Sequence, residues 1–477
     1  MNRENSLSRI TEEKGSWDLV IIGGGASGLG VALDALSRGL KVLLLEKSDF
    51  AKGTSSRSTK LVHGGVRYLA QGEVGLVLEA LKERGRLLNN APHLTINQPF
   101  VIPLYSYFDR LKYGVGLKIY DWMAGSLRLG KSMFVSKEET IKRLPQIKQK
   151  GLKGGILYHD GQFDDARLAL AIAKTCIEMG GCILNYARVN KLTKGEDGRI
   201  NGLVFRDLIG KSNYRISAKS VVNATGVFAD KILQMDNPEA PKMIQPSQGI
   251  HLVLDSSFLG GEDALMIPET SDGRVLFAVP WEGKLVVGTT DTLVKKPKME
   301  PRPLASEITF ILDTAKNYLV RPPKRSDVLS VFAGLRPLAA PKEGSTKTKE
   351  ISRSHKVIVS KSNLITITGG KWTTFRKMGE DTVDVHFKNH GLQKLASNSA
   401  EKHLHGYSEE EIEGHLQLYG ADFLSRRCRI LLLDAKASME MAPKVAEIMA
   451  KELKKDEAWI TEELEEFNKL AKKYLIK

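Results

Sequence analysis

A glycine turn between two apolar strands gives this sequence its clearest chemical signal. Gly23, Gly25 and Gly28 stand in G-x-G-x-x-G spacing directly after the apolar run Leu19–Ile22. The first glycine allows a tight turn, the second lets the backbone approach a pyrophosphate, and the third lets helix and strand pack closely. The helix N-terminus offers N–H groups to phosphates, and Glu46 at the end of the next strand can bind a ribose. The pattern predicts a dinucleotide site for FAD or NAD.

Three later segments favour a flavin at this site. Gly53–Lys60 is rich in small hydroxyl residues that can bind a pyrophosphate or a flavin edge. The strands Val221–Ala224 and Leu364–Thr368 both run into glycine turns. Open α/β sheets bind ligands in the crevice at their carboxyl strand ends, so we expect these ends to meet at one cleft.

Composition restricts the class of protein. The 477 residues predict two or three domains, and hydrophobic and charged contents of 42% and 27% are typical of a globular protein. The net charge of +15 needs a partner or an explanation, and nucleic acid, an anionic membrane surface and an anionic substrate are the candidates. The membrane surface is favoured because no nucleic-acid module is visible and the basic residues are dispersed. The three cysteines show no C-x-x-C pairing, so we expect reduced thiols, and we expect no metal site.

Periodicity predicts the elements that position the chemistry. Closely spaced strands between about 250 and 290 indicate an antiparallel sheet, and the chain becomes helical from about Tyr407, where Ser408 and Glu411 resemble a capping box. The individual elements expected are strands at Leu252–Leu254, Val275–Val279, Leu285–Val287 and Cys182–Tyr186, and helices at Ala166–Met179, Ala435–Leu453 and Glu457–Leu475.

Five blocks of the sequence resemble the FAD-dependent glycerol-3-phosphate dehydrogenase family, the respiratory type that passes electrons to quinone. The blocks are Gly53–Leu69 (GTSSRSTKLVHGGVRYL), Asp160–Leu168 (DGQFDDARL), Asp272–Thr292 (DGRVLFAVPWEGKLVVGTTDT), Gly334–Leu338 (GLRPL) and Gly369–Arg376 (GGKWTTFR). The resemblance spans nearly the whole chain and implies FAD as the cofactor. No Cys or His suited to flavin attachment is evident, so we expect non-covalent binding.

The fold class expected from these patterns is α/β, with three parts. A Rossmann-like FAD-binding domain comprises residues 1–92, 150–244 and 345–400, an antiparallel-sheet substrate domain comprises 93–149 and 245–344, and a C-terminal α-helical domain comprises 401–477. We interpret Asp164, Asp165 and Arg167 as structural, with a cap on the helix at Ala166.

The implied reaction oxidises sn-glycerol 3-phosphate to dihydroxyacetone phosphate. It requires a hydride acceptor, a base for the hydroxyl proton and cations for the phosphate. His63 and His251 are the candidate bases, Lys371 can stabilise an alkoxide or polarise the flavin, and Arg336 completes the catalytic set. The expected substrate contacts are Arg67, Tyr68, Arg336, Arg353 and Thr373.

The expected cofactor contacts come from the glycine turn and the matching blocks. They are Gly23, Gly25, Ala26, Ser27, Gly28, Glu46, Lys47, Thr54, Ser55, Ser56, Ser58, Thr59, Lys60, Leu61, His63, Gly64, Gly65, Ala224, Thr225, Gly226, Gly370, Lys371 and Thr373.

One departure from the family and two rival activities stay open. Many relatives carry a basic residue where this chain has Gln248, which puts the placement of the phosphate in doubt. An oxidase of the same family would return electrons to oxygen, and an amine or amino-acid oxidase would share only the flavin domain. A flavin-bearing scaffold without turnover is the non-enzyme alternative.

Aromatic and basic residues gather between Val101 and Val135, including Tyr107, Trp122 and Lys118. Such a mixture suits the headgroup boundary of a membrane, although a helix that covers its own core would explain it too. The polar N-terminus resembles neither a secretory signal nor a good transit peptide. We expect a cytoplasmic protein attached peripherally to the inner membrane, with a homodimer as a further expectation.

Overall fold

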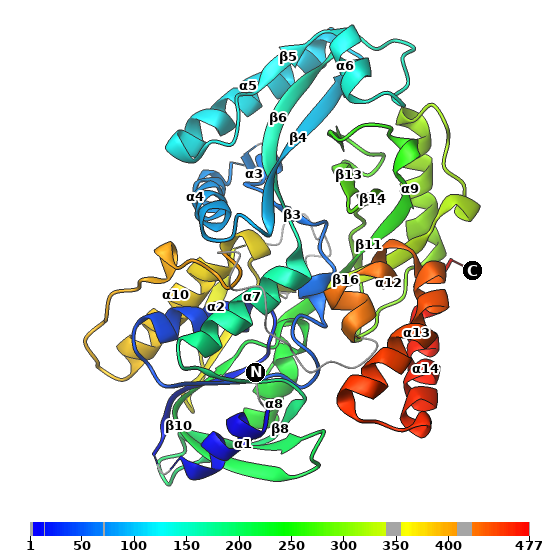
Figure 1. Ribbon diagram of the computed structural model, residues 1–477. Coiled ribbons are helices and arrows are strands. Elements are labelled where there is room, and N and C mark those ends of the chain that lie inside the picture. The colour runs from blue at the N-terminus through cyan, green and yellow to red at the C-terminus, as the bar shows by residue number, and fades with distance from the viewer. Residues whose placement is uncertain (1–2, 14, 70–71, 340–353, 408–421, 477) are drawn as a thin grey trace.

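The structure is a computed structural model that describes residues 3–13, 15–69, 72–339, 354–407 and 422–476. It contains two β-sheets and a group of C-terminal helices (Figure 1). The predicted capping box at Ser408 and Glu411 lies outside the described residues.

The first sheet carries the glycine turn. Its strands lie in the order β17 (Lys356–Val359), β18 (Leu364–Thr368), β10 (Asn213–Asn223), β1 (Trp17–Ile22), β2 (Val42–Leu45) and β7 (Cys182–Leu184). From β18 to β7 all four pairs are parallel, so the carboxyl ends of these five neighbouring strands lie at the same edge of the sheet. The antiparallel strands β8 (Ala187–Lys194) and β9 (Ile200–Asp207) extend from β10.

Both faces of this sheet are covered, which explains its continuous apolar strands. Helices α2 (Ala26–Ser37), α7 (Asp165–Glu178) and α10 (Phe375–Asn389) pack on one face, against Leu19 and Ile21 of β1. The opposite face of β1 packs against β8, β9, α1 (Arg3–Glu12) and α8 (Ala229–Asp236).

The second sheet is antiparallel apart from the parallel pair of β4 and β12. Its strands lie in the order β15 (Thr292–Leu293), β11 (Ile244–Asp255), β14 (Lys284–Gly288), β13 (Leu276–Trp281), β12 (Ala264–Ile267), β4 (Thr95–Leu104), β6 (Gly154–Phe163) and β3 (Leu61–Val62). β16 (Ser330–Ala339) also pairs with β11, and β5 (Met133–Val135) with β6.

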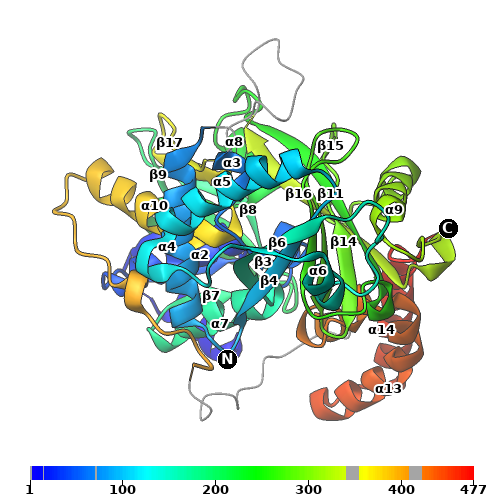
Figure 2. The same ribbon diagram turned by 90° about the horizontal axis from the view of Figure 1, so that it is seen from above.

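Helices cover the second sheet on both faces. α9 (Ala305–Tyr318) packs on the face of Ile250 and Leu252, whereas α12 (Ile430–Leu433), α13 (Ala435–Leu453) and α14 (Glu457–Ala471) pack on the face of Val253. Figure 2 shows α13 and α14 on the side of the molecule away from α10. Helices α3 (Val66–Leu69), α4 (Val74–Asn90), α5 (Tyr107–Ala124) and α6 (Lys137–Arg143) belong to the upper part in Figure 1.

Most predicted elements are confirmed, with small corrections at their ends. The strand predicted to reach Tyr186 ends at Leu184, because Tyr186 has a φ of 52° that a strand cannot continue through. The last helix ends at Ala471 rather than Leu475. The domain boundaries stay a prediction, and two strands assigned to the FAD-binding domain, β3 and β6, pair in the second sheet.

Candidate active site

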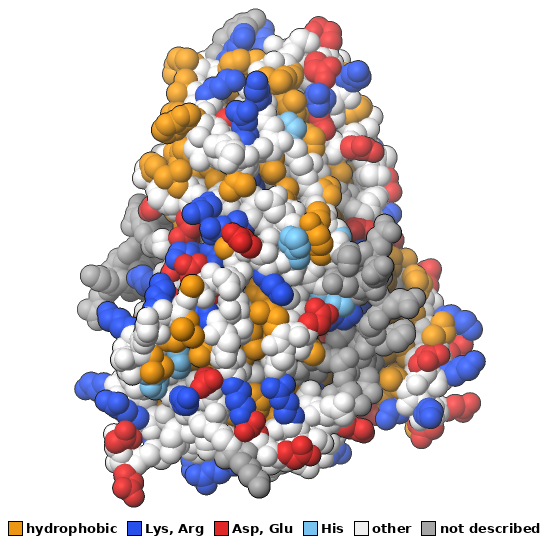
Figure 3. Space-filling view, turned by 60° about the vertical axis from the view of Figure 1, so that its left-hand side comes forward, with side chains coloured by type: hydrophobic (Ala, Val, Ile, Leu, Met, Phe, Trp, Pro, Cys, Tyr) orange, Lys and Arg blue, Asp and Glu red, His pale blue; other side chains and the backbone are white. Residues whose placement is uncertain are grey.

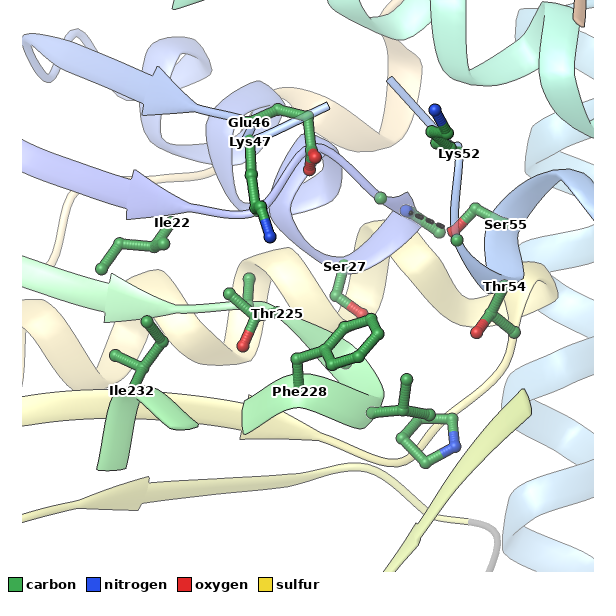
Figure 4. Close-up of a pocket in the computed structure, with 18 of the residues that line it drawn as sticks. Ile22, Ser27, Glu46, Lys47, Lys52, Thr54, Ser55, Thr225, Phe228 and Ile232 are labelled. Carbon is green, nitrogen blue, oxygen red and sulfur yellow. Dashed lines mark hydrogen bonds between the residues drawn. The ribbon is translucent and has the colours of Figure 1, made fainter. Parts of the chain in front are cut away.

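A cavity of about 530 Å³ lies where the parallel strands of the first sheet end. Residues from the ends of β1, β2 and β10 line it together with the turn after β18. The structure therefore brings together the strand ends that the sequence predicted at one crevice. Figure 4 shows Glu46 and Lys47 from the end of β2 across from Thr225 and Phe228, which follow β10.

The glycine turn is shaped by close backbone contacts. Gly23 has a φ of +115°, and a Cβ at Gly28 would lie 1.9 Å from the Gly23 carbonyl oxygen. A Cβ at Gly25 would meet Ser55 Oγ at 3.1 Å, and this hydroxyl accepts a 3.0 Å hydrogen bond from the Ala26 N–H (Figure 4). The turn therefore leaves bare backbone and the start of α2 facing the cavity, as pyrophosphate binding requires.

Glu46 is fixed by the backbone around it. Its carboxylate accepts 2.7 Å hydrogen bonds from the N–H groups of Gly24 and Ser48. Burial raises the pKa of Glu46, and these two hydrogen bonds oppose that rise. The side chain lines the cavity, so its remaining acceptor positions can meet ribose hydroxyls.

A second cavity of about 180 Å³ lies between the glycine-rich segment after β3 and the second sheet. It is lined by Thr59, Leu61, His63, Gly65, Val66, Tyr68, Phe100, Tyr158, Asp160, Met266, Arg274, Val275, Phe277, Thr289, Thr290, Asp291 and Arg336. Cationic, hydroxyl and imidazole groups converge here on a small, mostly apolar chamber, as is typical of a substrate site.

Arg336 on β16 points into this second cavity. Its Nη1 donates to the Thr290 carbonyl oxygen at 3.0 Å, and its Nη2 donates to Thr289 Oγ1 at 3.1 Å. Asp291 Oδ1 lies 3.6 Å from Nη1. A Cβ at Gly249 would fall 2.4 Å from Nη2, so the guanidinium in this position lies directly over the bare backbone of Gly249 on β11.

Lys371 lines the first cavity and reaches toward the second. Its Nζ lies 5.3 Å from the ring centre of Tyr68, a residue of the second cavity. Burial lowers the pKa of Lys371 to about 8, although the charges of Asp160 and Glu79 act in the opposite direction. Lys371 is therefore a cation that can lose its proton near neutral pH.

The two candidate histidines differ in position. His63 lines the second cavity, and its carbonyl oxygen accepts a 3.2 Å hydrogen bond from the Thr373 hydroxyl. His251 is buried, stacks on Phe332 and contacts Thr59 Oγ1 through Nε2 at 2.9 Å. Burial lowers the pKa of His251 well below its usual value, so its ring stays neutral.

Most of the expected cofactor residues line one of the two cavities. Those on the first cavity are Gly23, Gly25, Ala26, Ser27, Glu46, Lys47, Thr54, Ser55, Ala224, Thr225, Gly226, Gly370 and Lys371. Those on the second cavity are Thr59, Leu61, His63 and Gly65.

The other expected site residues lie elsewhere. Gly28, Ser56, Ser58, Lys60, Gly64 and Thr373 line neither cavity. The Ser58 hydroxyl and the Lys60 ammonium both bind the carboxylate of Asp165, at 2.7 Å and 2.6 Å. The side chain of Arg67 and the whole of Arg353 lie outside the described residues.

Sequence reasoning missed several residues of the second cavity, among them Arg274, Asp160 and Asp291. Arg274 and Asp291 stand in the DGRVLF and GTTDT blocks, so the resemblance located them without giving them a role. The predicted helix cap is confirmed, because Asp164 accepts a 3.0 Å hydrogen bond from the Arg167 N–H.

Comparisons with protein families agree with this geometry. The model of the FAD dependent oxidoreductase family matches residues 18–384. The model of the C-terminal domain of alpha-glycerophosphate oxidase matches residues 376–460.

Individual relatives and structures are similar over most of the chain. The mitochondrial glycerol-3-phosphate dehydrogenase of Schizosaccharomyces pombe is 42% identical, over 89% of this chain and 70% of that protein. That of Saccharomyces cerevisiae is 44% identical, over 83% and 67%. The FAD complex of the Bacillus halodurans glycerol-3-phosphate dehydrogenase superposes with a TM-score of 0.80 at 28% identity, covering 99% of this chain and 98% of that one.

The contact of Gly28 with Gly23 gives a test of the dinucleotide site. We expect Gly28→Ala to raise the FAD dissociation constant by about tenfold or more, because an added methyl group in a tight backbone contact costs about 1–3 kcal/mol. The flavin-to-protein absorbance ratio during dialysis measures the change. Gly75→Ala, where a Cβ meets no atom within 4 Å, is the control, and equal FAD retention by both variants would contradict the assignment.

Proposed function

Because this chain belongs to the FAD-dependent glycerol-3-phosphate dehydrogenase family, we propose that it oxidises sn-glycerol 3-phosphate to dihydroxyacetone phosphate and passes the electrons to a quinone. One observation carries the proposal: Arg336 points into a small cavity with His63, and Lys371 reaches toward it from the dinucleotide cavity. A phosphate ester with a neighbouring hydroxyl group matches that arrangement of a fixed cation and a base.

The residues of the first cavity fit FAD. The bare backbone at Gly23 and Gly25 and the start of α2 can hold the pyrophosphate, and Glu46 can hold the adenosine ribose. When bound, FAD would supply the hydride acceptor for the carbinol carbon of the substrate. The protein supplies binding, orientation and proton transfer.

Arg336 is the proposed phosphate ligand. Its guanidinium is already held in one plane by Thr289 and Thr290, so a phosphate finds a fork that needs little further ordering. Tyr68 shares the cavity and is proposed as a further contact. Arg67 and Arg353 remain proposed substrate contacts on the resemblance alone.

His63 is the proposed base for the hydroxyl proton, because it lines the second cavity whereas the His251 ring lines neither. Thr373 contributes by holding the His63 backbone in place. Lys371 is proposed as a cation that stabilises negative charge on the substrate oxygen as the proton leaves. Positioned proton transfer of this kind contributes about 10²–10⁴ in rate.

Anaerobic mixing with sn-glycerol 3-phosphate tests the proposal. We expect rapid loss of the flavin absorbance near 450 nm, reversed faster by a soluble quinone than by air. Recolouring by air at full rate with formation of peroxide would favour the oxidase alternative. Absence of bleaching would mean that the proposed substrate is wrong.

Lys371 gives a test by pH. If its ammonium form is required, kcat/KM falls as pH rises through about 8, the value to which burial lowers the pKa of Lys371. Lys371→Arg keeps a permanent charge, so this limb of the profile should disappear even where the rate itself is lower. A wild-type kcat/KM that instead rises through pH 8 would make Lys371 the base.

An exposed apolar face on α5 supports the proposed membrane contact. Phe108, Leu111, Val115, Ile119 and Trp122 follow one another at helical spacing, with exposed fractions of 75%, 68%, 53%, 43% and 82%. Figure 3 shows hydrophobic side chains mixed with Lys and Arg over this upper part of the molecule. In the part of the chain that the structure describes, no helix is long and apolar enough to span a bilayer.

The charges around α5 favour an anionic membrane surface. Arg110 on α5 and Arg128 and Lys131, which follow α5 in the chain, are exposed, and the guanidinium of Arg110 lies 4.4 Å from the ring centre of Phe134. Apolar side chains that enter the headgroup layer and cations that meet anionic lipid add to each other in binding. Such a surface would also bring the enzyme to a membrane-borne quinone.

Liposome flotation tests the α5 face. We expect the triple change Phe108→Ser, Leu111→Ser and Trp122→Ser to weaken binding to anionic liposomes more than about tenfold, since each lost apolar side chain contributes roughly 1.5–3 kcal/mol when buried. A matched triple change at Val320, Leu392 and Leu395, which are also exposed, should have no effect. If the α5 variant floated as well as the wild type, lipid binding by this face would be contradicted. If the wild type formed a dimer without lipid and the α5 variant did not, the face would be a dimer interface instead.

A further inference from the structure

Behind Arg336, on the opposite face of the second sheet, lies a buried carboxylate for which the reaction described above has no use. Glu307 stands in the first turn of α9 and is 4% exposed. Its Oε2 accepts 2.8 Å hydrogen bonds from Gln248 Nε2 and from the Leu304 N–H, and its Oε1 accepts one of 3.0 Å from the Thr290 hydroxyl. All three donors are neutral.

The register of β11 explains why Gln248 takes part. Ser247 lies opposite Arg336 in the pairing of β11 with β16, and Gln248 lies opposite Leu335. Because side chains alternate along a strand, Gln248 shares its face with Ile250, and this is the face that α9 covers. Gln248 does not line the second cavity.

The amide nitrogen of Gln248 makes two hydrogen bonds on this hidden face. Its Nε2 donates to the Arg302 carbonyl oxygen at 2.9 Å as well as to Glu307. Both partners are acceptors, so the amide nitrogen and not the amide oxygen must face them. The expectation that position 248 governs the phosphate directly therefore finds no support in the geometry.

The Glu307 carboxylate reaches Arg336 through Thr290. The Thr290 hydroxyl accepts a 3.1 Å hydrogen bond from the Ile250 N–H and donates to Glu307, which fixes the residue on the α9 side. On the other side, the Thr290 carbonyl oxygen accepts the 3.0 Å hydrogen bond from Arg336. One residue thus connects the buried carboxylate to the guanidinium.

We infer that Glu307, supported by Gln248, is a positioning residue that holds the segment from Thr289 to Asp291 and thereby sets the orientation of Arg336 toward an anion. The inference rests on the proposed role of Arg336 in binding phosphate. It also means that Gln248, where many relatives carry a basic residue, acts in the buried hydrogen-bond network with Glu307 and does not contact the substrate.

Inorganic phosphate is a suitable probe, because its binding to the FAD-loaded enzyme can be followed as a perturbation of the flavin spectrum without turnover. Glu307→Gln turns one acceptor oxygen into a donor that faces other donors, which loosens the turn. We expect the phosphate dissociation constant and the KM for glycerol 3-phosphate to rise roughly three- to tenfold, the factor for one lost hydrogen bond. We expect kcat to stay within about twofold.

A double-mutant cycle with Arg336→Lys separates positioning from general stability. Lysine cannot hold Thr289 and Thr290 as a planar fork, so Glu307→Gln should change the phosphate dissociation constant by less than about twofold in that background. If Glu307→Gln raised the phosphate dissociation constant by the same factor in the wild-type and the Arg336→Lys backgrounds, the inference would be overturned. Asp313→Asn, an exposed change on the same helix, is the matched control.

Gln248→Lys tests the face assignment directly. A lysine on the α9 side can pair with Glu307, so the KM should stay within about twofold, whereas a KM about tenfold lower would place residue 248 at the substrate and overturn the inference. If Glu307→Gln loses FAD or thermal stability, Gln248→Met replaces it in the cycle, because it removes the amide that donates to Glu307 and to the Arg302 carbonyl oxygen.

The outcome stays separate from that of the proposed function. An unchanged phosphate affinity in Arg336→Lys would refute the positioning role whether or not the wild-type enzyme turns over. Bleaching of the wild-type flavin by glycerol 3-phosphate decides the proposed function independently.

Discussion

The buried ion pair of Lys60 and Asp165 is the interaction on which the arrangement of both cavities depends. The ammonium lies 2.6 Å from the carboxylate, with both side chains almost fully buried. It also lies 4.9 Å from the ring centre of Trp281 and 5.5 Å from that of Phe332, both in the second sheet. The Lys60 ammonium therefore connects α7, which packs on the first sheet, to strands β13 and β16 of the second sheet. Buried charges are stable only when paired and hydrogen-bonded, which fixes the path of the chain here.

This fixed path matters because a single segment serves both cavities. Thr54 and Ser55 line the dinucleotide cavity, and Thr59 and His63 line the second cavity a few residues later. The segment crosses between the sheets at Lys60, whose φ of 64° marks a sharp change of direction. The proposed cofactor and substrate contacts are thus held at a set separation by backbone that neither ligand would have to order.

How far the sequence predicted this site depended on the range of the interactions. The glycine turn and Glu46 could be predicted because spacing along a strand and a helix defines them locally. The partner of Lys60 could not, since Asp165 lies 105 residues away and only packing brings the two together. The sequence therefore predicts Lys60 as a cofactor contact, like Thr54 and Ser55 of the same segment, whereas in the structure it lines neither cavity. The sheet face on which Gln248 lies could not be predicted either, because a shift of one residue in strand register moves every side chain of the strand to the opposite face.

Helix α5 connects the exposed surface to the interior of the site. On its buried side, the Tyr120 hydroxyl donates a 2.8 Å hydrogen bond to Asp160, which also accepts from the Gly64 N–H at 3.3 Å and from Arg84. The tyrosine oxygen lies so close to Gly64 that a Cβ there would approach it to 2.4 Å. Interiors are close-packed, so such a contact transmits displacement rather than absorbing it. The helix that carries the exposed apolar face is therefore held in register with the glycine-rich segment beside His63. Any partner that binds this face meets a surface whose position is already set by the active site.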